Sequence, residues 1–132
     1  MNDADLSLRE QYVTTADGWS LHLRRTISPR HFDPSSKPLL IVPGYGMNSF
    51  IFGYHPRGTS MKRCLAEAGF EVWSIDMRGQ GSSRPNGGGR GNIRLLDYVS
   101  HDVPTAVTRV LETTDTKASE LTLVGASLGG SI

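Results

Sequence analysis

The sequence predicts an α/β fold in which an antiparallel hairpin leads into a mostly parallel sheet flanked by helices. Apolar and polar residues alternate near the N-terminus, short apolar runs occupy residues 39–42, 71–75 and 121–124, and apolar residues recur at helical spacing between those runs. A helix after each strand returns the chain to the same edge of the sheet, so successive strands lie parallel. No repeat or linker interrupts the sequence, and we expect a single domain over residues 1–132.

The first predicted element is the hairpin. Residues 11–15 are rich in β-forming side chains, and an Asp-Gly pair, a strong turn signal, follows them. In the second strand Leu21 and Leu23 alternate with His22 and Arg24. This alternation predicts one face on the core and one face in water, so we expect His22 to be exposed.

The middle of the chain predicts a loop, a helix and a strand. Residues 49–60 are aromatic and irregular, whereas residues 61–68 show helical spacing. Gly69 fits the position just after a helix end. Cys64 reads as a small buried residue of this helix. The expected buried face consists of Met61, Cys64, Leu65 and Ala68.

The last third predicts a second helix before the final strand. Residues 86–91 are glycine-rich and predict a flexible loop. Apolar residues then recur at helical intervals over residues 98–113, with Pro104 expected in or near the first turn. A polar loop over residues 114–120 leads to the strand at residues 121–125.

The composition argues against several classes of protein. With 14 basic and 13 acidic residues, the net charge of +1 gives no electrostatic basis for binding nucleic acid or an anionic membrane. A single cysteine excludes an internal disulfide. The polar start lacks the apolar core of a signal peptide, and no apolar run approaches the length of a transmembrane helix. We expect a cytoplasmic protein.

Ser127 is the candidate nucleophile because of the residues around it. The apolar run at residues 121–124 leads directly into a G-x-S-x-G pentapeptide. A sharp turn between a buried strand and a helix can present a reactive serine, and it crowds the neighbouring backbone. Gly125 and Gly129, two residues before and after the serine, relieve that crowding. Taken alone, the pentapeptide also fits a glycine-rich turn in which Ser127 is an ordinary helix N-cap.

Two further loops follow apolar runs. The sequence P-G-Y-G-M-N occupies residues 43–48, and D-M-R-G-Q-G-S-S occupies residues 76–83. Both loops and Ser127 fall at the carboxyl ends of predicted parallel strands, where α/β proteins place their active groups. In order and spacing, the three motifs resemble the nucleophile elbow, oxyanion loop and D-x-R-G-x-G-x-S stretch of the α/β-hydrolase superfamily, in particular its serine esterases and lipases.

The resemblance implies a role for each motif. Ser127 would form an acyl-enzyme with an ester or related acyl substrate, a small molecule. The implied oxyanion donors are the backbone N–H groups of Leu128, Tyr45 and Gly46. Asp76 would organise its loop by accepting backbone N–H groups. No cofactor and no metal is implied, and lipase, esterase and thioesterase activities stay open.

The four histidines all precede Ser127 in the sequence. His55 follows the oxyanion loop, and we expect it to line the substrate pocket. His22, His31 and His101 read as exposed side chains. The superfamily places its acid and histidine after the nucleophile, yet residues 128–132 contain neither.

The chain therefore resembles the N-terminal part of an α/β-hydrolase fold that is truncated after strand 5. We expect it to form a single, incomplete domain. We expect the isolated chain to be catalytically inactive, with the strand at residues 121–125 as an open apolar edge. A non-catalytic remnant, or a half that pairs with a missing C-terminal half, is an alternative. An NAD(P)-binding module is a further one, although Ser131 replaces the final glycine of its loop and no acidic ribose partner follows.

Overall fold

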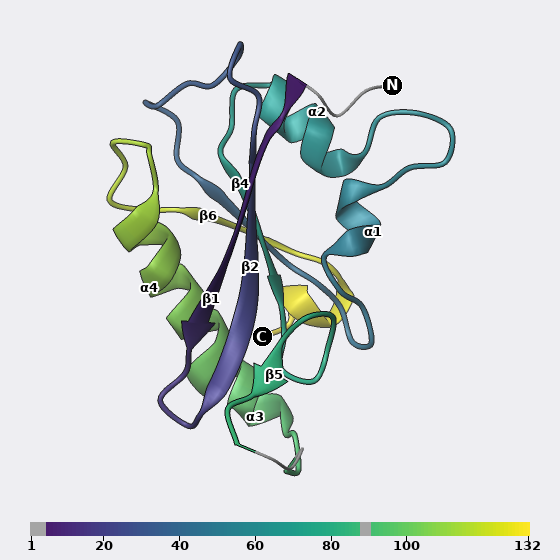
Figure 1. Cartoon of the computed structure of the whole chain (residues 1–132), viewed down its shortest axis with the longest axis vertical. Helices are drawn as coiled ribbons and strands as arrows, with labels where there is room; N and C mark the ends of the chain where they lie inside the picture. The colour runs from purple at the N-terminus through teal and green to yellow at the C-terminus, as the bar shows by residue number, and fades with distance from the viewer. Residues whose placement is uncertain (1–4, 88–90) are drawn as a thin grey trace.

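The computed structural model describes residues 5–87 and 91–132, so residues 88–90 of the predicted glycine-rich loop lie outside the described residues. The described residues form a mixed sheet in the order β1-β2-β4-β3-β6, with β5 paired to β2 (Figure 1). The strands are β1 (Ser7–Thr14), β2 (Trp19–Ile27), β3 (Leu39–Val42), β4 (Val72–Asp76), β5 (Arg84–Pro85) and β6 (Thr122–Gly125).

The predicted hairpin and parallel strands are both present. β1 pairs with β2, and β2 pairs with β4, in antiparallel orientation. The strands β4, β3 and β6 run parallel, with Val42 of β3 opposite Gly125 of β6. The short strand β5, which the sequence did not predict, pairs with the start of β2. The fold class is thus confirmed, and β6 occupies the predicted edge of the sheet.

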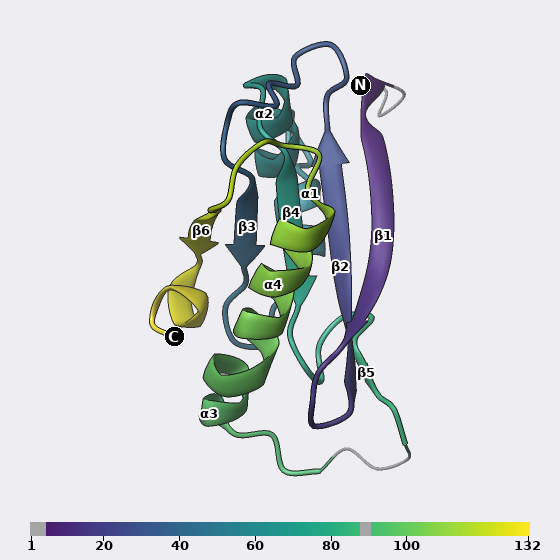
Figure 2. The same cartoon turned by 90° about the vertical axis from the view of Figure 1, so that its left-hand side faces the viewer.

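Helices cover both faces of the sheet, as Figure 2 shows, with α3 and α4 on one side and α1 and α2 on the other. The short helix α1 lies in the segment that was predicted to be irregular. No described helix is both long enough and apolar enough to cross a membrane. The helices are α1 (Phe50–Gly53), α2 (Met61–Glu67), α3 (Leu95–Asp97) and α4 (Val103–Thr113).

The two faces of the sheet bury different side chains. A large apolar cluster, with Leu21, Trp73 and Val110 among its members, packs between the sheet and α4. A smaller cluster, with Ile41, Phe52 and Ala66, packs under α1 and α2. Because side chains alternate along a strand, the even-numbered residues of β2 face this second layer.

The prediction that His22 is exposed is therefore wrong. His22 is only 2% exposed and packs against Tyr12, with ring centroids 5.1 Å apart. The alternation in β2 was read correctly, but helices α1 and α2 cover the face that was taken to be wet. A one-sided amphipathic strand and a two-sided α/β strand with polar residues on one face give the same sequence pattern.

Helix α2 also faces the sheet differently from the prediction. Met61, Cys64 and Ala68 are exposed, so their expected burial is wrong. The buried residues of the helix are Lys62, Arg63 and Ala66. The long aliphatic stems of a lysine and an arginine cover the sheet here in place of the apolar side chains. The helix end is as predicted: Gly69 has φ +103° and its N–H donates to Ala66 O (3.0 Å).

The second predicted helix is interrupted at its start. Residues Tyr98–Asp102 form a π-helical segment between α3 and α4. Pro104 lies in the first turn of α4, as predicted, where its missing N–H costs no helical hydrogen bond. The widened turn buries Tyr98 and Asp102, and it leaves Val99 exposed. A π-helical turn often marks a functional segment.

A buried ion pair joins β2 to the start of β4. The Arg25 Nε donates to Glu71 Oε1 over 2.6 Å, and both side chains are almost fully buried. Glu71 also accepts from Thr114 Oγ1 and from the N–H of Asp115. Burial alone would raise the pKa of Glu71, but the hydrogen bonds from Thr114, Arg25 and Asp115 outweigh it and hold the pKa below its usual value. The network fixes the loop after α4.

We predict that Arg25→Met destabilises the protein by about 3–5 kcal/mol, because Glu71 then stays buried without its cation. The measurement is the urea midpoint at neutral pH. The control is Lys37→Met, which breaks the exposed Lys37–Glu120 pair (2.7 Å) and should cost less than about 1 kcal/mol. Equal losses in the two variants would contradict the prediction.

Candidate active site

Ser127 lies at the tip of a sharp turn between β6 and a single 3₁₀ turn, Ser127–Gly130. Its φ of +54° is the only positive value among the described residues other than glycine. This left-handed conformation costs a residue with a side chain roughly 1–2 kcal/mol. The side chain is exposed. Backbone strain at this position is what a nucleophile elbow requires, and an ordinary N-cap has a different backbone conformation.

The glycines on both sides of Ser127 are required by close backbone contacts. A Cβ at Gly129 would lie 2.2 Å from Val42 O, and a Cβ at Gly125 would lie 2.4 Å from Gly130 Cα. Both distances are far below van der Waals contact, and the opposing atoms belong to the backbone. The N–H of Ala126 in this turn donates a hydrogen bond to Val42 O (3.0 Å). Only glycine therefore fits at positions 125 and 129.

The loop after β3 packs directly against this turn. A Cβ at Gly44 would lie 3.1 Å from the Cβ of Ser127, so the two segments are in contact. Tyr45 follows and is exposed. The backbone N–H groups of Tyr45 and Leu128 donate to no acceptor within the described residues. Two unused donors beside a serine are what an oxyanion hole requires.

Gly46 differs from Tyr45 in its hydrogen bonding. With its side-chain amide oriented to suit its neighbours, Gln80 accepts from Gly46 N (3.3 Å) and donates to Met47 O. The N–H of Gly46 is thus engaged within the loop. Of these two N–H groups, that of Tyr45 has no acceptor among the described residues, whereas that of Gly46 has one.

A hollow of about 260 Å³ adjoins the oxyanion loop. Its apolar walls come from Ile93 and Tyr98, which the sequence analysis did not single out. Ser127 is not among the residues that line this hollow. The hollow is lined by Tyr45, Gly46, Arg78, Gly79, Gln80, Ile93 and Tyr98.

Asp76 organises the loops at this edge of the sheet, as predicted. Its carboxylate accepts from the N–H of Ser49 (2.8 Å) and of Ser82 (3.0 Å), and His22 Nδ1 lies 3.1 Å from Oδ2. Burial alone would raise the pKa of Asp76, but the hydrogen bonds from Ser82, Ser49 and His22 hold it below its usual value. The loops after β3 and β4 are thus tied to one carboxylate.

Arg78 makes a second tie, which sequence reasoning missed. Its guanidinium donates to Asp17 (2.7 and 3.0 Å) and to Asp102 (2.9 Å) and lies over the ring of Trp19. Burial raises the pKa of the Asp102 carboxyl. The arginine of the D-x-R-G motif therefore joins three segments: the hairpin turn, the loop after β4 and the π-helical segment. The D-x-R-G motif was the feature of the sequence from which this role of Arg78 could have been predicted.

The structure does not bring a histidine to Ser127. No hydrogen bond joins the Ser127 hydroxyl to a histidine in the described part of the chain. His55 is exposed and lines a hollow beside Tyr54 and Pro56 that does not include Ser127. His31, exposed as expected, bonds Ser28 Oγ, and His101 is partly buried near Asp17 (3.7 Å).

We predict that Gly129→Ala loosens the elbow. The new Cβ cannot fit beside Val42 O, so the turn must move away from β3 at a cost of about 1–3 kcal/mol or more. Amide exchange at Ala126, whose N–H donates to Val42 O, should then be markedly faster. Gly87→Ala is the matched control, because a Cβ at that position meets no atom within 4 Å. Unchanged protection at Ala126 would contradict the steric account.

We predict that Asp76→Asn lowers stability at pH 7 by about 1–3 kcal/mol, since the amide cannot accept from all of the groups that face Asp76. The folded-state pKa of Asp76 is lowered, so its contribution is present above the pKa of the unfolded chain and is lost as pH falls through the folded pKa. The gap between variant and wild type in urea midpoint should therefore narrow below about pH 4. Glu112→Gln, on the exposed side of α4, should show no such gap. A gap that stays constant with pH would contradict the prediction.

Known structures share the fold of this chain. An acetyl xylan esterase from Paenibacillus sp. R4 matches with a TM-score of 0.67 and 27% identity, over 96% of this chain and 43% of that one. A Pyrococcus furiosus esterase matches with a TM-score of 0.67 and 20% identity, over 98% and 46%. An oligopeptidase B from Leishmania major matches with a TM-score of 0.66 and 18% identity, over 98% and 18%. The chain spans less than half the length of each of these structures.

No curated protein sequence matches the chain significantly. The family described as serine aminopeptidase, S33, matches residues 37–132, which is most of the chain. That range begins before β3 and includes the oxyanion loop, the D-x-R-G stretch and the turn at Ser127. The chain belongs to the S33 serine aminopeptidase family of α/β-hydrolases.

Proposed function

We propose that the protein is a serine hydrolase that cleaves an ester or related acyl bond of a small molecule through an acyl-enzyme on Ser127. The observation that carries the proposal is the strained backbone of Ser127, an exposed serine at φ +54° held between two glycines that no other residue can replace. A fold tolerates such strain where function requires it.

The oxyanion loop supports the same chemistry. The Ser127 hydroxyl attacks the carbonyl carbon, and its proton passes to a base. The negative charge that develops on the carbonyl oxygen is met by the N–H groups of Leu128 and Tyr45, which have no other acceptor among the described residues. The alcohol then leaves, and water releases the acid from Ser127. The similarity to an acetyl xylan esterase favours an ester over an amide.

The proposal includes a restriction on the isolated chain. A serine needs an adjacent base, and the described histidines are engaged elsewhere. His22, for example, contacts Asp76 and lies on β2, which β4 and β3 separate from β6. We propose that the 132-residue chain alone turns over no ester. The acid and the base would come from a polypeptide segment that the chain does not contain.

The open edge of β6 favours a second candidate role, that of one half of a two-part hydrolase. Among the described strands β6 pairs only with β3, and Leu123 on it is about half exposed. An unpaired apolar edge is a template for another strand. A polypeptide that pairs with this edge and carries an acid and a histidine would complete the site.

The test is reaction with a fluorophosphonate and turnover of p-nitrophenyl acetate. We expect the isolated chain to show no turnover above that of Ser127→Ala. We expect the form made by its source organism to carry the probe on Ser127. Ser131→Ala is the matched control, because it removes a neighbouring exposed hydroxyl and should leave labelling unchanged.

Each outcome separates the parts of the proposal. Turnover by the isolated chain that disappears in Ser127→Ala would refute the restriction and keep the nucleophile. Absence of label in the native form would refute the nucleophile. Activity that appears only when a second polypeptide is added would support the two-part role.

A further inference from the structure

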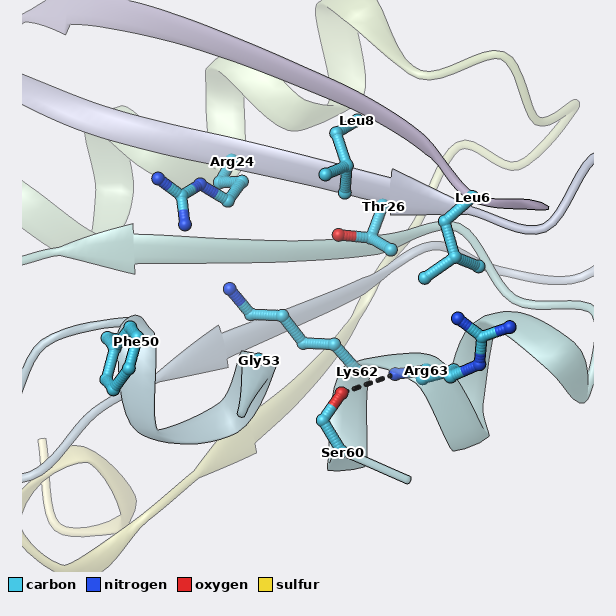
Figure 3. A pocket seen from close by; sticks show the side chains of 9 residues that line it. All are labelled: Leu6, Leu8, Arg24, Thr26, Phe50, Gly53, Ser60, Lys62 and Arg63. Carbon is cyan, nitrogen blue, oxygen red and sulfur yellow. Dashed lines mark hydrogen bonds between the residues drawn. The ribbon is translucent and has the colours of Figure 1, made fainter. Parts of the chain in front are cut away.

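A pocket of about 170 Å³ lies between the hairpin and the two short helices, on the sheet face that carries His22 and Asp76. Figure 3 shows Leu6 and the guanidinium of Arg63 at one end, Leu8 between the ends, and the head groups of Lys62 and Arg24 at the other end, beside Phe50. None of its lining residues belongs to the elbow or the oxyanion loop. The remaining lining residues are Thr26, Gly53, Ser60 and Arg63.

Lys62 is the unusual group in this pocket. Its side chain is 4% exposed, and its ammonium nitrogen is buried without a hydrogen-bond acceptor among the described residues. A buried cation is costly unless an acceptor pairs with it. Burial, followed by repulsion from Arg24, lowers the pKa of Lys62 to about 8, so the group still carries its proton at neutral pH. A charged donor therefore faces the pocket unsatisfied.

The neighbouring charges strengthen the demand for an anion. Arg24 Nη2 donates a hydrogen bond to Glu10 Oε1 (2.6 Å). The guanidinium has further N–H groups that can donate to a ligand. Arg63 is engaged with Glu67 on its own helix (2.8 Å). The carboxylate of Asp76 favours the charged form of Lys62, yet it is occupied by Ser49, Ser82 and His22. None of these carboxylates is hydrogen-bonded to the Lys62 ammonium in the described structure.

We propose that this pocket binds a small carboxylate whose charged end pairs with Lys62 and Arg24 and whose short apolar end lies on Leu6 and Leu8. The volume equals about five or six water molecules, which suits a chain of a few carbons. Leu8 and Phe50 are each more than half exposed, so a bound ligand would cover apolar surface. Arg63, which lies beside Leu6, is paired with Glu67, so Lys62 and Arg24 supply the donors for the charged end while Leu6 and Leu8 offer apolar surface to a short chain.

The test is a titration of the protein with butyrate, followed by amide chemical shifts in NMR spectra at pH 7. We expect millimolar binding, with the largest shifts at Arg24, Gly53 and Lys62. Lys62→Met should weaken binding by about tenfold or more, because a charge-assisted hydrogen bond is lost. Removal of an unpaired buried charge should not impair folding, and Lys62→Gln is the second variant if Lys62→Met is insoluble.

Three controls separate the proposal from general effects. Lys37→Met removes an exposed lysine elsewhere and should bind butyrate like the wild type. Butyramide, which has the same shape without the charge, should not bind. Ser127→Ala should bind butyrate unchanged, which makes this pocket independent of the proposed catalytic site.

Two results would overturn the proposal. One is butyrate binding that is equal in Lys62→Met and the wild type, or absent in the wild type. The other is binding of inorganic phosphate in preference to butyrate, which would show that the apolar end plays no part and that the site selects charge alone.

Discussion

The carboxylate of Asp76 is the interaction on which the edge of the sheet around the candidate site depends. It lies at the end of β4 and accepts backbone N–H groups from the loops after β3 and β4, which are far apart in sequence. It also contacts His22 of the hairpin. Buried carboxylates are costly unless every acceptor position is used, and here several partners meet that cost. Without this tie, the segment that follows Tyr45 would have no fixed anchor at Ser49.

The elbow itself depends on a second constraint, which is steric. The turn at Ser127 lies so close to the end of β3 that a single carbon at position 129 would overlap a backbone carbonyl oxygen. Register and strain are therefore coupled. The parallel pairing of Val42 with Gly125 brings the two strand ends level, and the turn that follows places Ser127 in a left-handed conformation. The strain is held by the sheet, since the 3₁₀ turn is too short to hold it alone.

The hairpin, the parallel strands and the glycines of the elbow could be predicted from the sequence. Which charged residues are buried could not. The glycines at positions 125 and 129, the hairpin and the parallel strands each follow from a local pattern with one physical solution. Burial of His22, Lys62 and Arg78 does not, because a charged residue on an amphipathic element normally faces water. The burial of His22 and of Arg78 depends on partners that are distant in the sequence, Asp76 for His22 and Asp17 for Arg78.

The two faces of the sheet bury different sets of side chains. The face under α4 carries the main apolar core, with Trp73 and Ile75 of β4 in it, and the buried Arg25–Glu71 ion pair lies at its edge. On the face under α1 and α2, alternation places Ser74 and Asp76 of β4 instead. This face combines a smaller apolar cluster with the hydrogen bonds of Asp76 and His22, whose strength depends on how completely each group is paired. Within the described residues, His22 Nε2, Ser74 Oγ and the Lys62 ammonium of this face are buried without a hydrogen-bond partner. Of these, the Lys62 ammonium lines a pocket, so a ligand that supplies an acceptor could pair with it there.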